Sequence, residues 1–336
     1  KSFLVNMNCG YTETVINGGT FTSPSGAPNA MLKNHDTYAR ARILGGTFTN
    51  NNNLATLLIG NTAGLVIGKP DGTGPTIYQY GSAPLMKTNN DITSGNDITI
   101  YGGEFVQDRS WGYHIDLNHK IACKLEVAGG TFTSTKACSG DMIRVNDSGI
   151  QNFVISGGTF IQESEGSNAV VQKNNGTLTI TGGTFIITSP NNKNPLIQLV
   201  NNKPNGAFLM EGDKIILSSQ SATNSPIINE SGCPVTFSNF KYTSTDANAL
   251  PLLEINIKGN TSPNPIYFNG CEINTVTTPI RLKGDIKAKL ELDDNTKITT
   301  KGFAFDNQNG STIILNNAQV LSRKLINLKG AANGNL

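Results

Sequence analysis

The sequence predicts an all-β fold, a single right-handed parallel β-helix of about twelve coils, with roughly 27 residues and three strands in each coil. Three observations lead to this prediction. A Gly-Gly pair recurs at nearly constant spacing, apolar and polar residues alternate just before each pair, and a short apolar strand follows each variable loop. Because a repeat array has no natural size limit, we interpret residues 1–336 as one continuous β-helix domain.

The repeat centres on Gly-Gly-Thr-Phe and its close variants. Upstream of one pair, Leu178 and Ile180 flank Thr179, and this alternation of period two indicates a strand with one buried face. A straight strand would point Ile180 and Phe185 to opposite faces. Glycine tolerates positive φ and has no Cβ, so the pair is interpreted as a corner that turns both side chains inward. The corners are expected at Gly18, Gly45, Gly72, Gly102, Gly129, Gly157 and Gly182, and then near 212, 239, 270, 295 and 317.

A phenylalanine follows three residues after the first glycine of most pairs. Stacked coils would bring these rings into one aromatic ladder inside the rod, formed by Phe21, Phe48, Phe105, Phe132, Phe160 and Phe185. The threonine before each ring faces solvent. In the later coils, the phenylalanine position is expected to be filled by Ile215, Tyr242, Ile273, Ile298 and Val320.

The third strand of each coil is short and apolar, as in "HIDLN" from His114 and "MIRVN" from Met142. Twelve coils with strands about 4.8 Å apart would form a rod of roughly 55 to 60 Å. Both ends of the sequence align with the middle of a coil. We therefore expect a segment of a longer protein, in which uncapped coils allow end-to-end self-association.

The composition bears on three points: nucleic acid as a partner, a membrane span, and a role for the cysteines. Charged residues make up 15% of the chain and the formal net charge is +2, which gives no electrostatic reason to expect nucleic acid as a partner. No apolar run approaches the roughly 20 residues that span a membrane. The five cysteines are far apart and form no Cys-x-x-Cys motif, so they are interpreted as packing residues and not as disulfides or zinc ligands.

The coil pattern resembles the pectate-lyase-like right-handed β-helix superfamily over essentially the whole chain, and the "GGTFT" coils are similar to those of large bacterial cell-surface proteins. The resemblance implies an extracellular or cell-surface protein that acts as a stalk or adhesin, with a polysaccharide or cell-surface glycan as its partner. The same fold hosts enzymes and phage spikes. A polysaccharide lyase or glycoside hydrolase is therefore the first alternative, and a phage tail fibre is the second.

The motifs of the enzymes in this superfamily are incomplete here. An Arg-Leu-Lys stretch begins at Arg281 and an aspartate pair lies at Asp293 and Asp294, in the reverse of the order found in polygalacturonase-like members. The Gly-His-Gly and Asn-Thr-Asp motifs are absent. Three acidic residues do not coincide at matching coil positions, as a calcium site of the pectate-lyase type requires. A non-catalytic protein without a cofactor is therefore favoured over an enzyme.

Candidate ligand-binding residues concentrate in one stretch of the chain. A sugar site needs an apolar platform beside a few fixed polar groups, and this stretch supplies Glu104, Asp108, Arg109, Trp111, Tyr113 and His119. Glu104 also replaces threonine in an otherwise uniform outward row. The alternative is a surface loop whose polar and aromatic residues have no function.

Catalytic candidates lie on the third strand. Asp116 and Arg144 share an outward position one coil apart, and His114 is expected to point outward beside Asp116. These three residues could supply acid–base chemistry on a polysaccharide. The favoured interpretation is a solvent-exposed ion pair worth less than about 1 kcal/mol. His114, Asp116 and His119 lack a further ligand, so no metal site is expected.

Overall fold

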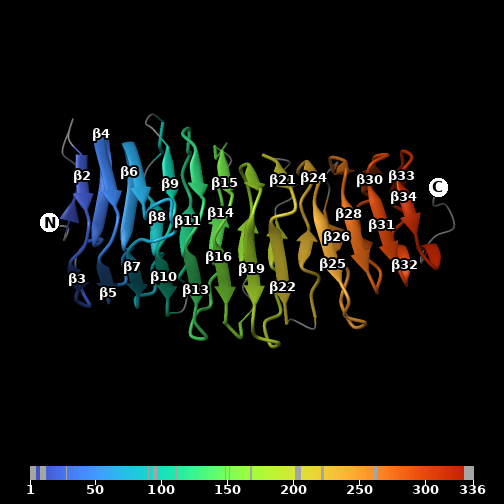
Figure 1. Ribbon diagram of the computed structural model, residues 1–336, viewed down its shortest axis with the longest axis horizontal. Helices are drawn as coiled ribbons and strands as arrows, with labels where there is room; N and C mark the ends of the chain where they lie inside the picture. Colours follow the sequence, from blue (N-terminus) through green and yellow to red (C-terminus); the bar gives the residue numbers. More distant parts are fainter. Residues whose placement is uncertain are drawn as a thin grey trace.

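The computed structural model describes residues 5–7, 13–27, 29–89, 91–93, 97–109, 112–147, 149–150, 152–166, 169–200, 206–220, 223–259 and 263–328, apart from the side chains of residues 35–37 and 61–63. The described residues form 35 β-strands and no α-helix. The strands stack along one straight rod whose two chain ends lie at opposite ends (Figure 1). No described segment is a helix long and apolar enough to cross a membrane.

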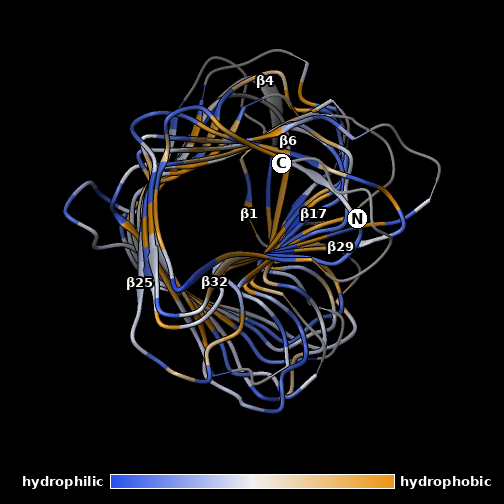
Figure 2. Ribbon diagram, turned by 90° about the vertical axis from the view of Figure 1, so that its right-hand side faces the viewer, coloured by the Kyte–Doolittle hydropathy of each residue, from blue (hydrophilic) through white to orange (hydrophobic). Residues whose placement is uncertain are grey.

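Each coil contains a first, a second and a third strand, and the strands pair in parallel with their counterparts in adjacent coils, except that β22 and β25 do not pair. Viewed along the rod, the coils superimpose and the loops project outward (Figure 2). The first strands are β2 (Glu13–Ile16), the second half of β4 (Leu32–Ile43), the second half of β6 (Leu57–Ile67), β9 (Ile98–Ile100), β12 (Leu125–Val127), β15 (Phe153–Ile155), β18 (Leu178–Ile180), β21 (Phe208–Glu211), β24 (Val235–Ser238), β27 (Ile266–Asn269), β30 (Lys289–Leu292) and β33 (Thr312–Leu315).

The second strand follows the corner and, among the described residues, occurs in twelve copies, eight in one sheet and four in another. These strands are β3 (Thr20–Ser23), β5 (Thr47–Asn50), β7 (Thr76–Gln79), β10 (Glu104–Gln107), β13 (Thr131–Ser134), β16 (Thr159–Gln162), β19 (Gly183–Ile187), β22 (Ile215–Ser219), β25 (Lys241–Ser244), β28 (Glu272–Thr275), β31 (Lys297–Thr300) and β34 (Gln319–Leu321).

The third strands join the first strands in a single sheet of 23 strands, because β4 and β6 run without interruption from third strand to first. They are β1 (Val5–Asn6), the first halves of β4 and β6, β8 (Met86–Thr88), β11 (Ile115–Leu117), β14 (Ile143–Val145), β17 (Val171–Lys173), β20 (Ile197–Leu199), β23 (Ile227–Asn229), β26 (Leu253–Ile257), β29 (Ile280–Gly284), β32 (Phe303–Asn307) and β35 (Lys324–Leu328). The predicted right-handed parallel β-helix with three strands per coil is confirmed.

The predicted aromatic ladder is present in two parts, because Ile77 of β7 lies between Phe48 and Phe105. The rings of Phe105, Phe132, Phe160 and Phe185 stack in order with centroid distances of 4.5, 4.9 and 5.1 Å, and their planes are within 13° of parallel. All four rings are buried. The corners before them have the predicted conformation too, since the second glycine of each pair has a φ between 93° and 121°.

One predicted ladder position is wrong. Phe185 pairs with Leu217, whereas Ile215 pairs with Gly183. Ile180 and Met210 are register partners, but Phe185 follows Ile180 by five residues whereas Leu217 follows Met210 by seven, so the longer corner shifts the position next to the ring to Leu217. The residues predicted for the last coils do form one file, in which Tyr242, Ile273, Ile298 and Val320 pair in succession.

Buried side-chain amides at the ends of several second strands form hydrogen bonds to loops of the preceding coil. Gln79 donates to the backbone carbonyl of Asn52 at 3.0 Å and accepts from the Asn50 amide at 2.8 Å. Gln107 donates to the carbonyl of Gly81 at 3.2 Å. Because these carbonyls belong to loops of the previous coil, the amides hold the loops at one height along the rod.

The described cysteines are packing residues, as predicted. Cys123, Cys138, Cys233 and Cys271 are buried and free of disulfides. Cys9 lies outside the described residues.

Candidate functional site

The predicted site residues separate onto two faces of the rod. Glu104 lies on β10, in the eight-stranded sheet, while Asp116 and Arg144 lie on β11 and β14, in the 23-stranded sheet. We call the outer surface of the third strands the third-strand face. Trp111 lies outside the described residues.

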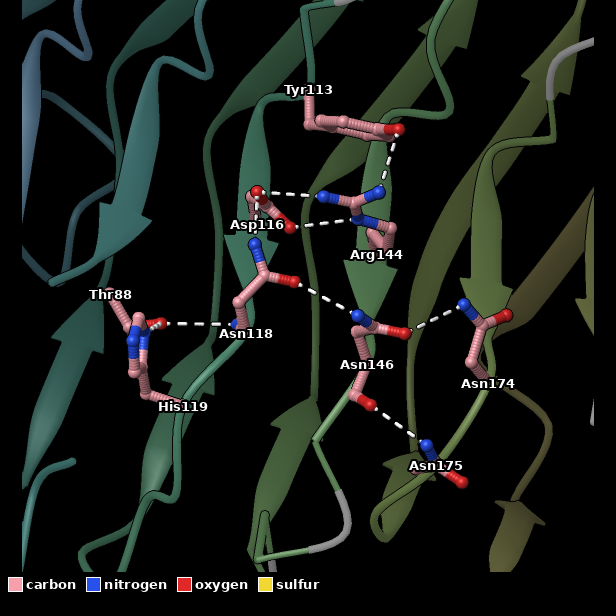
Figure 3. Close-up of polar contacts among 9 residues, drawn as sticks. All are labelled: Thr88, Tyr113, Asp116, Asn118, His119, Arg144, Asn146, Asn174 and Asn175. Atoms are coloured by element: carbon pink, nitrogen blue, oxygen red, sulfur yellow. Dashed lines mark hydrogen bonds and ion pairs between the residues drawn. The ribbon is translucent and has the colours of Figure 1, made fainter. Parts of the chain in front are cut away.

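Asp116 and Arg144 form an ion pair on the third-strand face. They are register partners in adjacent coils, and the guanidinium binds the carboxylate through two parallel bonds, Nε to Oδ1 at 2.9 Å and Nη2 to Oδ2 at 3.0 Å (Figure 3). Asn118 donates a further bond to Oδ2 at 2.6 Å. Asp116 is 2% exposed, so the expected solvent-exposed ion pair is instead a largely buried one. Its carboxylate oxygens are therefore already occupied by donors.

Tyr113 completes the environment of Arg144. Its ring centroid lies 4.1 Å from the guanidinium carbon, and its hydroxyl accepts a hydrogen bond from Nη1 at 3.0 Å (Figure 3). Burial raises the pKa of Tyr113, while the positive charge of Arg144 opposes that rise. The arginine is thus held on two sides and cannot approach a substrate as a free base.

The expected outward orientation of His114 is wrong. The imidazole is completely buried, with Nε2 at 3.1 Å from the backbone oxygens of both Phe105 and Thr133. Its ring lies edge-on to Phe132 at 5.9 Å. Two carbonyl neighbours require a proton on Nε2, and burial lowers the pKa of His114 to about 4. The physical reason is local: β11 begins only at Ile115, so the strand alternation that places Asp116 outward does not extend to His114.

A row of asparagines runs along the rod beside the Asp116–Arg144 pair. The Asn146 amide donates to Asn118 Oδ1 at 3.2 Å, and the Asn174 amide donates to Asn146 Oδ1 at 2.9 Å (Figure 3). Asn175 also donates to the Asn146 backbone oxygen at 2.9 Å. The sequence analysis did not single out this row, although its members recur at 28-residue steps. The row provides an ordered polar surface across three adjacent coils.

Asp141 is a second carboxylate in this region that the sequence analysis missed. It is 8% exposed, and one oxygen accepts the backbone N–H of Ala169 at 2.7 Å. Burial raises the pKa of Asp141 to about 6, although the Ala169 bond and the charge of Arg144 act in the opposite direction. It lies just before β14, outside the strands, where no strand alternation marks it.

A cavity of about 470 Å³ opens near the N-terminal end of the third-strand face. Lys33, Leu58 and Lys87 occupy successive outward positions along it, so two ammonium groups flank one apolar side chain. His119 lines the cavity, with Nδ1 3.3 Å from the Thr88 hydroxyl (Figure 3). Of the predicted ligand-binding residues that the structure describes, His119 is the one that lines this cavity.

A second charge cluster lies further along the same face. Arg281 binds Glu254 at 3.4 Å and Asp306 at 3.2 Å, and Lys283 binds Glu254 at 2.7 Å. Glu254 and Arg281 are register partners in adjacent coils, as Asp116 and Arg144 are. With two cations and two anions in mutual contact, this cluster is electrostatically balanced.

The remaining predicted residues lie elsewhere. Glu104 is exposed and adjoins a shallow groove floored by the corner glycines. Asp108 accepts a hydrogen bond from the Thr135 hydroxyl. Arg109 is exposed and lines a separate hollow with Tyr80. The structure therefore does not bring these three residues together with Asp116.

Among the described residues, no three His, Cys, Asp or Glu side chains gather in a way that could hold a metal ion. Comparisons of the chain with family models, with curated proteins and with solved structures gave no match. The fold thus defines the class, a parallel β-helix repeat protein, and the function must be argued from the third-strand face itself.

Proposed function

We propose that this chain is an extracellular or cell-surface β-helix of the pectate-lyase-like type with GGTF coils, and that it serves as a stalk or adhesin that binds glycan on its third-strand face. The rod shape and the continuous buried core suit a spacer that resists bending. The polar third-strand face supplies ordered amides and charges to a ligand lying along the rod.

One observation carries the proposal: the groups that catalysis would require are occupied by each other, whereas an open cavity lies beside them. Asp116 and Arg144 satisfy one another through two bonds, and His114 is buried in the core. A residue that must exchange protons with a substrate needs to reach it. This arrangement favours binding over turnover.

The cavity indicates the chemistry of the ligand. Leu58 provides an apolar floor, and Lys33 and Lys87 are placed on either side of it. Protein sites for small molecules combine such an apolar surface with a few fixed polar groups. A sugar unit with a carboxylate or sulfate group matches this combination.

A glycan array tests the proposal. Wild-type protein is expected to bind acidic glycans, and Lys87→Ala and His119→Ala are expected to weaken that binding about tenfold each. Lys136→Ala is the matched control, because Lys136 is exposed on a loop outside the cavity. Absence of binding by the wild type, or equal loss in the control, would contradict the proposal.

Sedimentation as a trimer would favour the phage tail fibre instead.

Polysaccharide cleavage is the second candidate, and Asp141 is the observation that favours it. Two carboxylates in different environments near one arginine are a common arrangement for acid–base chemistry, and Asp141 has the raised pKa expected of an acid. The test is turnover of acidic and neutral polysaccharides. Cleavage by the wild type that is lost in both Asp141→Asn and Asp116→Asn would establish the enzyme.

A further inference from the structure

The sheet of second strands is interrupted at one place. It is continuous from β3 to β22 and again from β25 to β34, but β22 and β25 do not pair. The same two coils remain paired on both other strands, where β21 joins β24 and β23 joins β26. The coils therefore separate only locally. We call the opening between Leu217–Ser219 of β22 and Tyr242–Ser244 of β25 the slit.

The change of corner explains why the sheet divides here. Up to Gly182, each corner with a glycine pair takes its positive φ at the second glycine. The corner before β25 instead uses Asn239, with a φ of 52°, followed by Phe240, which is fully buried and 5.9 Å from the ring of Phe237. The corner before β22 also departs from the glycine pair, because Gly212, with a φ of 93°, is followed by Asp213 and Lys214. The sheet thus divides between two coils whose corners both differ from those before them.

The slit contains a cavity of about 710 Å³, the size range of small-molecule sites. Peptide groups line its walls. The Gln220 N–H donates to the Ile187 carbonyl of β19, so Gln220 faces away from the slit. The Phe240 carbonyl accepts from the Glu272 N–H of β28, so Phe240 also faces away. Because the N–H and C=O groups of successive residues point to opposite sides of a strand, those of Leu217 and Thr243, an odd number of residues away, point into the slit. Leu217 and Tyr242 are both partly buried against the core and give the cavity an apolar side.

Hydroxyl and amide groups dominate the rest of the lining. Tyr242 and Ser244 each bring a hydroxyl to the lining, and Asn248 lies on the loop beyond β25. Asp246 supplies a carboxylate, and the described lining residues include no lysine, arginine or histidine. An anionic ligand would meet this carboxylate without a compensating cation, which is unfavourable in a partly enclosed site.

We propose that the slit is a binding site for a neutral saccharide unit, separate from the third-strand face and independent of the function proposed for it. Sugar hydroxyls both donate and accept hydrogen bonds, so they can satisfy the peptide, amide and hydroxyl groups that meet here. An extended peptide fits less well, because the cavity touches only three residues of each strand edge and is otherwise lined by loops. Backbone pairing with so short an edge would give a peptide little affinity.

The test uses an array of short neutral glucans, mannans, galactans and xylans, followed by calorimetry on any that bind. Tyr242→Phe and Asn248→Ala are each expected to weaken binding about three- to tenfold, the effect of losing one hydrogen bond. Ala249→Trp, which places a large ring in the slit, is expected to abolish binding. Lys87→Ala is expected to leave binding unchanged, because Lys87 lines the other cavity.

Thermal unfolding of each variant serves as the folding control, and the conservative Tyr242→Phe change keeps the partly buried ring in place. The proposal is overturned if the wild type binds none of the neutral saccharides, or if binding survives Ala249→Trp. It is also overturned if a peptide array gives ligands that Ala249→Trp displaces while the saccharides do not bind. Loss of acidic-glycan binding in Lys87→Ala would concern only the third-strand face.

Discussion

Gly129 lies directly against the carbonyl oxygen of Tyr101 in the preceding coil, so close that a Cβ on Gly129 would be 2.1 Å from that oxygen. The same close approach recurs at Gly157 and Gly182, where the distances would be 2.2 and 2.4 Å. The second glycine is needed for another reason: Gly130 has a φ of 95°, which residues with a side chain rarely adopt. The two glycines of one corner therefore satisfy two different constraints.

Substitution of the first glycine should destabilise the rod only where a coil lies beneath it. We expect Gly129→Ala to lower the free energy of unfolding by about 2 to 4 kcal/mol, because the coils must move apart to admit the methyl group. Gly18→Ala is the matched control, since nothing lies within 4 Å of a Cβ at that position. It should change stability by less than about 0.5 kcal/mol in a urea titration. Equal effects would contradict the close-approach explanation.

The aromatic ladder should show a similar dependence on position. Phe132 stacks on a ring at each side, and its truncation to alanine should cost about 3 to 5 kcal/mol. Phe21 is only partly buried and stacks on Phe48 alone, at 4.7 Å. Phe21→Ala should therefore cost clearly less in the same chemical denaturation experiment. A Phe132→Ala variant as stable as Phe21→Ala would show that stacking adds little to the core.

The sequence predicts most of the fold because, in a solenoid, the repeat length determines which residues stack on one another. Once the corner glycines fix the step, residues one step apart must stack, and Phe105, Phe132 and Phe160 do so. The prediction fails for Ile215 because the corner before β22 is two residues longer, so the position beside Phe185 moves to Leu217 while Ile215 stays buried. Corner length is decided by packing between coils, which the local sequence does not reveal.

The candidate site is less predictable than the fold. The pairing of Asp116 with Arg144 follows from the period, so it was predicted. His114 was misplaced because it precedes its strand and its ring finds two carbonyl acceptors inside. The cavity between Lys33 and Lys87 was missed, since it depends on how loops from three coils pack together. The loop residues that line this cavity do not alternate with a period of two, so the direction of their side chains cannot be predicted from the sequence.

The Asp116–Arg144 pair should contribute more to stability than an exposed pair. Asp116 is almost fully buried, so Asp116→Asn leaves the charge of Arg144 without its partner and should cost about 2 to 4 kcal/mol. Lys241 and Glu272 form an exposed pair at 3.9 Å, and Glu272→Gln should change stability by less than about 0.5 kcal/mol. A double-mutant cycle with Arg144→Met measures the coupling. A coupling energy near zero would show that the Asp116–Arg144 pair stabilises the protein no more than an exposed ion pair does.

His114 should make the rod less stable in mild acid. Its pKa in the folded protein is about 4, below the value of 6.5 for an exposed histidine. The unfolded chain therefore binds the proton more readily, so stability falls as the pH decreases from about 6.5 to 4, by about 3 kcal/mol. His114→Gln should remove this part of the pH dependence when unfolding is followed by urea titration at several pH values. A slope unchanged by the substitution would contradict the assignment.

Asp141 should act in the opposite direction over nearly the same range. Its pKa is raised from 3.8 to about 6, so the folded protein holds the proton more tightly than the unfolded chain. Its contribution to stability is complete below pH 3.8 and is lost as the pH rises through 6. Asp141→Asn should therefore stabilise the protein by about 3 kcal/mol at pH 7 and have little effect at pH 3.5, because the amide keeps the acceptor for the Ala169 N–H. The measurement is the difference, at each pH, between the free energies of unfolding of the wild type and of Asp141→Asn. Equal stability of wild type and Asp141→Asn at pH 7 would show that the buried carboxylate costs the fold nothing, and would remove the reason for regarding Asp141 as a residue kept for chemistry.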